Sequence, residues 1–294
     1  MTEQKKELDE RTLALILTFQ TNEATEHLVY KKIAKLAKNQ KNKETLEKIA
    51  DDEDHHAKIW YTYSQKKVKP RKFSLFLYPF LAKVLGITFA VKLMEKGEEQ
   101  AQHNYQRVLD VFPETKKIFD DENRHEHELI EIIDEEKLNY LGSIVLGLND
   151  ALVELTGALA GLSFALQQTK LIALAGLITG IAAAMSMAGS EYLSKKTEKD
   201  PKALRASVYT GLTYLATVLL LVSPYLIFNS YKTALTVTLA IGIVIIFCFT
   251  FFSATVQDQS FKKKFFEMTA ISLGVAAISF LISIVLKQFL GVDV

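Results

Sequence analysis

Apolar residues follow two different patterns along this chain, and the change comes near residue 140. Before it, leucine and alanine recur at helical spacing among lysines and glutamates, with breaks at Pro70 and Pro113. After it, long stretches are almost wholly apolar. The first pattern predicts amphipathic helices, and the second predicts helices that are apolar all round. We therefore expect an all-α protein, with one domain over residues 1–140 and a second over residues 141–294.

The second domain contains five apolar segments close to the ~20 residues that a helix needs to cross a membrane. They are Leu141–Leu166, Leu171–Leu193, Ser207–Phe228, Thr233–Ala254 and Met268–Leu290. A buried core of a water-soluble protein is the alternative, but too few polar residues remain to cover five such helices. The pattern therefore predicts a five-helix transmembrane domain.

Basic residues are distributed unevenly over the loops between these segments. The loops after the second and fourth segments carry Lys195, Lys196, Lys199, Lys202, Arg205, Lys262, Lys263 and Lys264, whereas the other two loops carry only Lys170 and Lys232. Cytoplasmic loops are enriched in lysine and arginine. We therefore expect the N-terminal domain in the cytoplasm and, after five spans, the C-terminus on the opposite side.

Composition separates the two domains further and excludes several classes of protein. Residues 1–140 hold 26 of the 34 acidic residues and 24 of the 35 basic ones. Because acids are interleaved with the basic residues, no nucleic-acid surface is expected. The single cysteine, Cys248, excludes an intrachain disulfide and a cysteine zinc site. The N-terminal apolar stretch is too short for a cleavable signal peptide.

The sequence of the first domain predicts four long helices. They are expected at Lys6–Asn39, Lys43–Lys66, Ile87–Phe112 and Glu114–Asn139. Short turns within each pair and a long connection between the pairs indicate a four-helix bundle with one crossover. Residues 73–81 of that connection are unusually apolar for a loop. They can lie on a membrane interface, with Lys69, Arg71, Lys72 and Lys83 near the headgroups, or be buried against a partner subunit.

All six histidines lie in the first domain, and two of them belong to ExxH motifs. Glu53 and His56 form the first motif, and Glu122 and His125 form the second. The i, i+3 spacing places each pair on one helix face. The two remaining helices supply further carboxylates, namely Glu23 on the first and Glu95, Glu98 or Glu99 on the third. Carboxylates and imidazoles on four facing helices predict a di-iron or di-manganese site.

Four ionisable or soft side chains lie inside the first two apolar segments. Asp150 and Glu154 share one helix face, and Met187 and Glu191 share another. Each carboxylate costs roughly 2.5–3.5 kcal/mol at the bilayer centre. One interpretation is helix–helix contact through hydrogen bonds to serine or threonine. The other is an ion path, in which carboxylates and a thioether suit Fe²⁺ or Mn²⁺ better than Mg²⁺ or Ca²⁺.

These residues resemble two known families. The N-terminal 140 residues resemble the rubrerythrin or ferritin-like (erythrin) domain. The run GSIVLGLNDALVE at 142–154 resembles the first membrane helix of the vacuolar iron transporter family, and SMAGSEYL at 186–193 resembles its second. The fusion resembles the membrane-bound ferritins of bacteria and archaea. Together the two resemblances cover nearly the whole chain.

The resemblance implies five membrane helices, a homodimer, and export of Fe²⁺ or Mn²⁺ from the cytosol in exchange for protons. The path residues of the transporter family correspond to Asp150 and Met187. Erythrin-type iron ligands correspond to Glu23, Glu53, His56, Glu98, Glu122 and His125, with Glu95 as a seventh candidate. The fusion type implies a prokaryotic plasma membrane. The glutamate-rich insert of the eukaryotic transporters is missing, because the loop Ser194–Ala206 is short and basic.

Three functions follow from this combination. A transporter would pass metal from the head through Glu191, Met187, Glu154 and Asp150. A membrane-anchored ferroxidase or peroxidase would use the spans only as an anchor. In a third version the head senses iron and gates the membrane domain. An anchor needs no acids within the membrane, so Asp150 and Glu154 favour transport.

Overall fold

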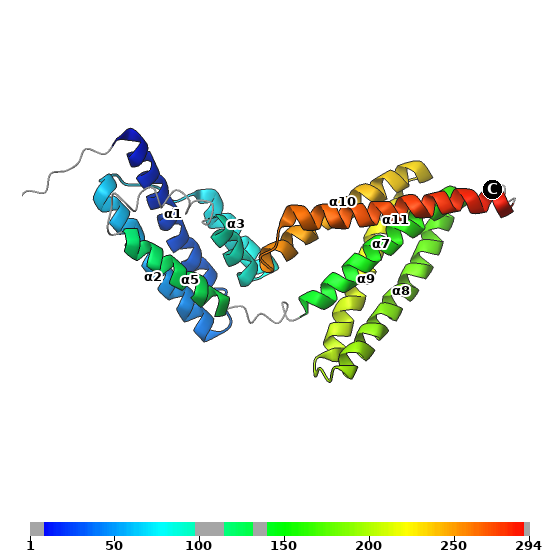
Figure 1. Cartoon of the computed structure of the whole chain (residues 1–294), viewed down its shortest axis with the longest axis horizontal. Helices are drawn as coiled ribbons and strands as arrows, with labels where there is room; N and C mark the ends of the chain where they lie inside the picture. Colours follow the sequence, from blue (N-terminus) through cyan, green and yellow to red (C-terminus); the bar gives the residue numbers. More distant parts are fainter. Residues whose placement is uncertain (1–8, 98–114, 132–139, 291–294) are drawn as a thin grey trace, which may run out of the picture. The chain divides into compact units, whose positions relative to one another are not determined.

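The computed structural model describes residues 9–97, 115–131 and 140–290, and the secondary structure within these ranges is helical, without a strand. The all-α expectation is therefore confirmed. The chain divides into two compact units, Met1–Glu135 and Glu136–Val294. Figure 1 shows the helices of each unit.

The first unit is built on a pair of long helices, α1 (Glu10–Ala34) and α2 (Gln40–Ser64), which pack along each other. Both begin at a capped residue. The Asp9 carboxylate accepts a hydrogen bond from the Thr12 amide at 2.6 Å, and the Asn39 side chain accepts one from the Lys41 amide at 2.8 Å. Such caps satisfy amides that have no partner within the helix.

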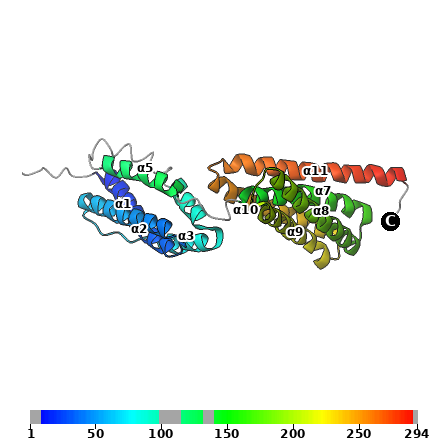
Figure 2. The same cartoon turned by 90° about the horizontal axis from the view of Figure 1, so that it is seen from below.

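The second half of the bundle is described in part. Residues 87–97 are helical, and α5 (Thr115–Glu131) lies against α2, as Figure 2 also shows. Both segments fall within the predicted helices. Apolar residues of α1, α2, the segment 87–97 and α5 form a common core, which includes Val29, Ile49, Val91 and Leu129.

The apolar crossover is a helix rather than a loop, which corrects the sequence-based expectation. Helix α3 spans Lys72–Leu85 and packs against α1. Pro79 lies inside it and cannot donate a hydrogen bond to the carbonyl of Leu75. That carbonyl instead accepts a hydrogen bond from Lys32 Nζ of α1 at 2.9 Å. The tertiary contact thus compensates for the proline.

The second unit consists of five helices that are long and apolar enough to cross a membrane. They are α7 (Leu141–Leu166), α8 (Thr169–Thr197), α9 (Ala203–Ile227), α10 (Tyr231–Val256) and α11 (Phe261–Leu290). Each overlaps one predicted span. Helix α7 lies in contact with the other four, and α8 packs closely on α9 (Figure 1).

Glycines at several helix contacts let these helices pack close together. A Cβ atom at Gly161 would lie 2.8 Å from Ser283 Oγ of α11, and one at Gly180 would lie 2.6 Å from Val218 Cγ1 of α9. On α7, a Cβ at Gly147 would collide with the backbone oxygen of Thr210. Small residues at such positions allow close helix packing in membranes.

Candidate metal centre

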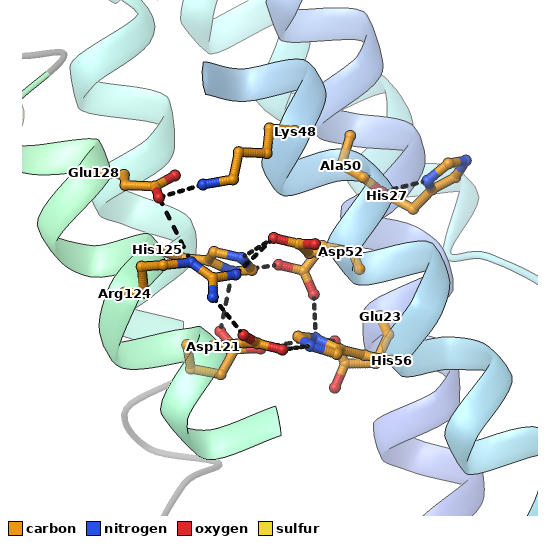
Figure 3. Close-up of polar contacts among 12 residues, drawn as sticks. Glu23, His27, Lys48, Ala50, Asp52, His56, Asp121, Arg124, His125 and Glu128 are labelled. Atoms are coloured by element: carbon orange, nitrogen blue, oxygen red, sulfur yellow. Dashed lines mark hydrogen bonds and ion pairs between the residues drawn. The ribbon is translucent and has the colours of Figure 1, made fainter. Parts of the chain in front are cut away.

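Four side chains from three helices of the first unit converge on one point. They are Glu23 of α1, Glu53 and His56 of α2, and Glu122 of α5, and their ligand atoms all lie within 4.8 Å of one another. Figure 3 shows the surroundings of this point. Glu23, Glu53 and His56 are at most 2% exposed. Burial of three carboxylates beside one imidazole is costly unless a positive charge is shared among them.

Both ExxH histidines turn the same ring nitrogen toward these carboxylates. His56 Nδ1 lies 3.3 Å from Glu53 Oε2, 3.4 Å from Glu122 Oε1 and 3.8 Å from Glu23 Oε2. His125 Nδ1 lies 3.2 Å from Glu53 Oε1 and 4.0 Å from Glu122 Oε2. The ring centroids are 5.9 Å apart. The structure therefore brings together five of the seven predicted ligands of the head.

The opposite ring nitrogens are held by aspartates in a crossed arrangement. His125 Nε2 of α5 lies 3.0 Å from Asp52 Oδ2 of α2, and His56 Nε2 of α2 lies 3.2 Å from Asp121 Oδ2 of α5 (Figure 3). A proton on Nε2 can be donated to the aspartate, which leaves Nδ1 free to bind a cation. Carboxylate–histidine pairs of this kind orient metal ligands and raise their basicity.

Arg124 joins the two aspartates. Its Nη1 atom lies 2.7 Å from Asp121 Oδ1, and its Nη2 atom lies 2.8 Å from Asp52 Oδ2. Burial raises the pKa of both aspartates, but the contacts with histidine and with Arg124 outweigh it, so each pKa is lowered. Both aspartates thus stay ionised and can accept the histidine protons.

The aspartates and Arg124 were not identified from the sequence. A signal was present, because an aspartate directly precedes the glutamate of each motif, in Asp52-Glu53 and Asp121-Glu122. A helix face drawn from i, i+3 spacing does not show that the aspartate of one helix reaches the histidine of another. Trp60 was missed for the same reason, although its Nε1 donates to Glu23 Oε1 at 3.2 Å.

The electrostatics of the cluster favour a cation. Burial raises the pKa of Glu53 well above its usual range, and burial together with repulsion from Glu53 raises the pKa of Glu122 to about 8. Burial lowers the pKa of His56, but hydrogen bonds to Glu122, Glu23 and Glu53 outweigh this effect and raise it. The carboxylates therefore hold a proton on His56. A divalent ion could replace that proton, and this set of oxygen and imidazole donors suits Fe²⁺ or Mn²⁺.

Of the helix predicted at Ile87–Phe112, the structure describes residues 87–97. Glu95 is half-buried on the helical segment 87–97 and is not one of the four converging residues. Glu98 and Glu99 lie outside the described residues. The choice of ligand on this helix therefore stays a prediction.

The predicted path residues of the second unit lie at separate levels. The Tyr214 hydroxyl of α9 donates to Glu154 Oε2 at 2.6 Å, and Asp150 lies one turn earlier on α7. The buried Glu191 of α8 accepts a hydrogen bond from Ser143 Oγ at 2.6 Å. Ser143 precedes Asp150 by seven residues, or about 10 Å along a helix axis.

Exposure differs among these residues. Glu154 is exposed, Asp150 and Met187 are half-buried, and Glu191 is 8% exposed. Met187 packs against the apolar core of the second unit, one turn before Glu191. The sequence did not identify Tyr214 or Ser143 as partners of the two glutamates.

Fold and site together define an integral membrane protein with a helical domain that contains a carboxylate–imidazole cluster. Residues 19–140 match the Rubrerythrin family, and residues 141–204 match the VIT family. These matches confirm the expected fusion of a ferritin-like domain with a VIT-family segment, in that order. No curated protein matches the chain. The VIT match and the five apolar helices support a metal transporter.

Proposed function

We propose that this protein exports Fe²⁺ or Mn²⁺ from the cytosol in exchange for protons, and that its ferritin-like head captures or senses iron. The observation that supports transport most directly is the set of carboxylates within apolar helices. Asp150 and Glu154 lie near the middle of the 26-residue helix α7. Such residues face a cavity or a protein partner rather than lipid.

The proposed path runs along α7. Glu191, at the level of Ser143, is the first carboxylate for an ion that enters from the side of the head. Met187 adds a thioether, and Asp150 and Glu154 follow along the helix. Separate sites let an ion bind at each level and then leave. Carboxylates that release a proton when metal binds would couple the two fluxes.

A homodimer is part of the proposal. Glu154 has one described hydrogen-bond donor, Tyr214, and is otherwise exposed on a membrane helix. Lipid offers no hydrogen bond to this carboxylate. A second copy could shield it by placing its own α7 nearby, so that the carboxylates of two chains line one water-filled path.

In the head, iron would be held by Glu23, Glu53, His56, Glu122 and His125. Glu95 and Glu98 are further candidate ligands, on the helix predicted at Ile87–Phe112. The bound ion would supply redox and Lewis-acid chemistry. The chain itself supplies a desolvated pocket, in which Trp60 orients Glu23 and the aspartates orient the histidines. We place the head in the cytosol of a prokaryotic cell, on the side of the basic loops.

A membrane-anchored ferroxidase or peroxidase is the second candidate. The crossed aspartate–histidine pairs support it, since oriented and more basic histidines would serve a catalytic metal as well as a captured one. In this version the membrane helices hold the enzyme at a surface, and substitutions at Asp150 leave its activity unchanged.

The test is metal flux into proteoliposomes that contain the purified full chain, under an imposed pH gradient. We expect Fe²⁺ or Mn²⁺ flux in the wild type and its loss in Asp150→Ala and Asp150→Asn. Glu198→Gln is the matched control, because Glu198 is exposed and pairs with Lys195 outside the path. Metal binding by the head is measured in the same preparations.

Two results would contradict the proposal. Flux that persists in both Asp150 variants would exclude the path along α7. A wild-type protein without flux, whose head still binds and oxidises iron, would establish the enzyme instead.

A further inference from the structure

Helix α3 has two apolar faces, and only one is buried. Leu75, Tyr78, Leu81 and Ala82 face the core of the head. On the outer face Phe73 and Phe76 are 72% and 69% exposed, and Phe80 and Val84 are each 50% exposed. Residues 73, 76, 80 and 84 follow helical spacing and therefore form one stripe. The rings of Phe76 and Phe80 stack at 6.0 Å and form one aromatic surface in the middle of the stripe.

The region around the stripe is strongly basic. Residues 55–94 contain eight lysines and arginines and no acidic residue, in a chain whose net charge is +1, and of these eight Lys58 pairs with Asp54 of α2. Six of them lie within α3 or shortly before it and are exposed, namely Lys66, Lys67, Lys69, Arg71, Lys72 and Lys83. An aromatic stripe bordered by cations fits an anionic partner with an apolar layer beneath its charged surface.

We propose that α3 docks the head on the surface of a bilayer that contains anionic lipids. The stripe of Phe73, Phe76, Phe80 and Val84 enters the boundary between headgroups and acyl chains. Long basic side chains extend from the ends of the helix toward lipid phosphates. Anionic lipids at the cytoplasmic surface attract such basic segments.

Charge distinguishes a lipid surface from a second copy of the chain. In a symmetric contact the same patch meets itself. Two α3 helices would then bring Lys69, Arg71 and Lys72 of one copy toward the identical cations of the other, with no acid within residues 55–94 to offset them. Anionic headgroups supply the missing opposite charge.

The covalent link between the head and the membrane helices also favours a lipid surface as the partner of α3. The head is continuous with five apolar helices that begin at Leu141. A bilayer is therefore always within reach, and the tether replaces a bimolecular encounter by an intramolecular one. The docking does not depend on metal transport, and it would equally hold a membrane-anchored enzyme at the surface.

The test places a fluorescent label on the stripe of the full chain in lipid nanodiscs. Cys248 is first replaced in Cys248→Ser, because it is a free, exposed cysteine. Phe76→Cys then carries an environment-sensitive label, and Phe80→Cys repeats the measurement one turn later. Tyr61→Cys is the matched control, since Tyr61 is an aromatic residue of α2 that is 40% exposed away from the stripe.

In discs of phosphatidylcholine and phosphatidylglycerol, we expect spin-labelled lipid to quench the label at residues 76 and 80 several-fold more than at residue 61. Iodide in the water should show the reverse order. The triple variant Lys69→Glu, Arg71→Glu and Lys72→Glu should reduce the lipid quenching severalfold, as should discs of phosphatidylcholine alone.

Each other outcome would overturn the proposal. A label at residue 76 that iodide reaches as easily as at residue 61 would mean that the stripe faces water. Protection from iodide without quenching by lipid would mean that protein, such as a second copy, covers the stripe. Equal lipid quenching with and without phosphatidylglycerol would exclude the anionic lipid as the partner.

Discussion

The carboxylates of the head and those of the membrane unit are arranged in opposite ways. In the head, three glutamates and two histidines from three helices meet within a few ångströms and are largely buried. In the membrane unit, carboxylates follow one another along α7 and α8. Glu154 and Glu191 are each bound by one hydroxyl group, from Tyr214 and Ser143.

The difference indicates two ways of handling a cation. A convergent set of charged ligands, in which Trp60 orients Glu23 and aspartates orient both histidines, favours tight binding at one point. A series of separated carboxylates with neutral partners binds an ion weakly at several points, as passage requires. Substitutions in each set of carboxylates test whether the two arrangements act separately.

The largest expected effect is on metal affinity of the head. Glu53→Gln combined with Glu122→Gln removes two converging carboxylates, one from each ExxH motif. We expect the affinity for Mn²⁺ or Fe²⁺ to fall by more than about 100-fold, beyond the loss typical of an outer-shell substitution. Anaerobic titration calorimetry on the full chain measures it. An unchanged affinity would show that the cluster is not the binding site.

Metal flux measured with the same variant distinguishes two roles of the head. Retained flux that no longer responds to iron would identify the head as a sensor. Lost flux, with Asp150 intact, would identify it as an obligatory capture site.

Metal binding by the head should depend strongly on pH. The pKa of Glu122 is raised to about 8, so below that pH a proton occupies a group that must be a carboxylate to bind metal. Apparent affinity should therefore rise by about tenfold per pH unit between pH 6 and pH 8 for each proton displaced, and less steeply above the pKa of Glu122, where only the proton on His56 is displaced. Titrations at several pH values measure the slope. A flat profile would contradict proton competition at the cluster.

Loss of either aspartate that contacts a histidine should reduce the metal affinity of the head by an intermediate amount. Asp52→Asn and Asp121→Asn each remove the charge that holds a histidine Nε2, and should each weaken metal binding by about 10- to 100-fold. Asp54→Asn is the control, because Asp54 lies on the same helix but pairs with the exposed Lys58. Equal affinities for all three variants would show that the crossed pairs do not orient the ligands.

The smallest effect is expected in the membrane unit. Tyr214→Phe removes the hydroxyl that donates to Glu154, and a hydrogen bond between membrane helices contributes about 0.6 kcal/mol on average. We expect flux in proteoliposomes to fall by about threefold, whereas metal binding by the head stays unchanged. Tyr231→Phe, at the start of α10, is the control. A change in head affinity would contradict the separation of the two arrangements.

Much of this organisation could be predicted from local sequence. The five membrane helices follow from apolar segments, and the shared faces of Glu53 with His56 and of Glu122 with His125 follow from i, i+3 spacing. The crossover was expected only as an apolar connection, and Pro79 is compatible with a helix there when another group satisfies the carbonyl of Leu75. Lys32, forty-three residues away, does so.

Periodicity and side-chain chemistry are local properties, so the helices and the residue types of both carboxylate sets could be predicted from the amino-acid sequence. Which of these residues meet depends on how the helices pack. Asp52 reaches His125, Asp121 reaches His56, and Tyr214 reaches Glu154 because helices distant in sequence pack side by side. Helix spacing fixes the face on which a side chain lies, whereas packing of the helices fixes what that face contacts.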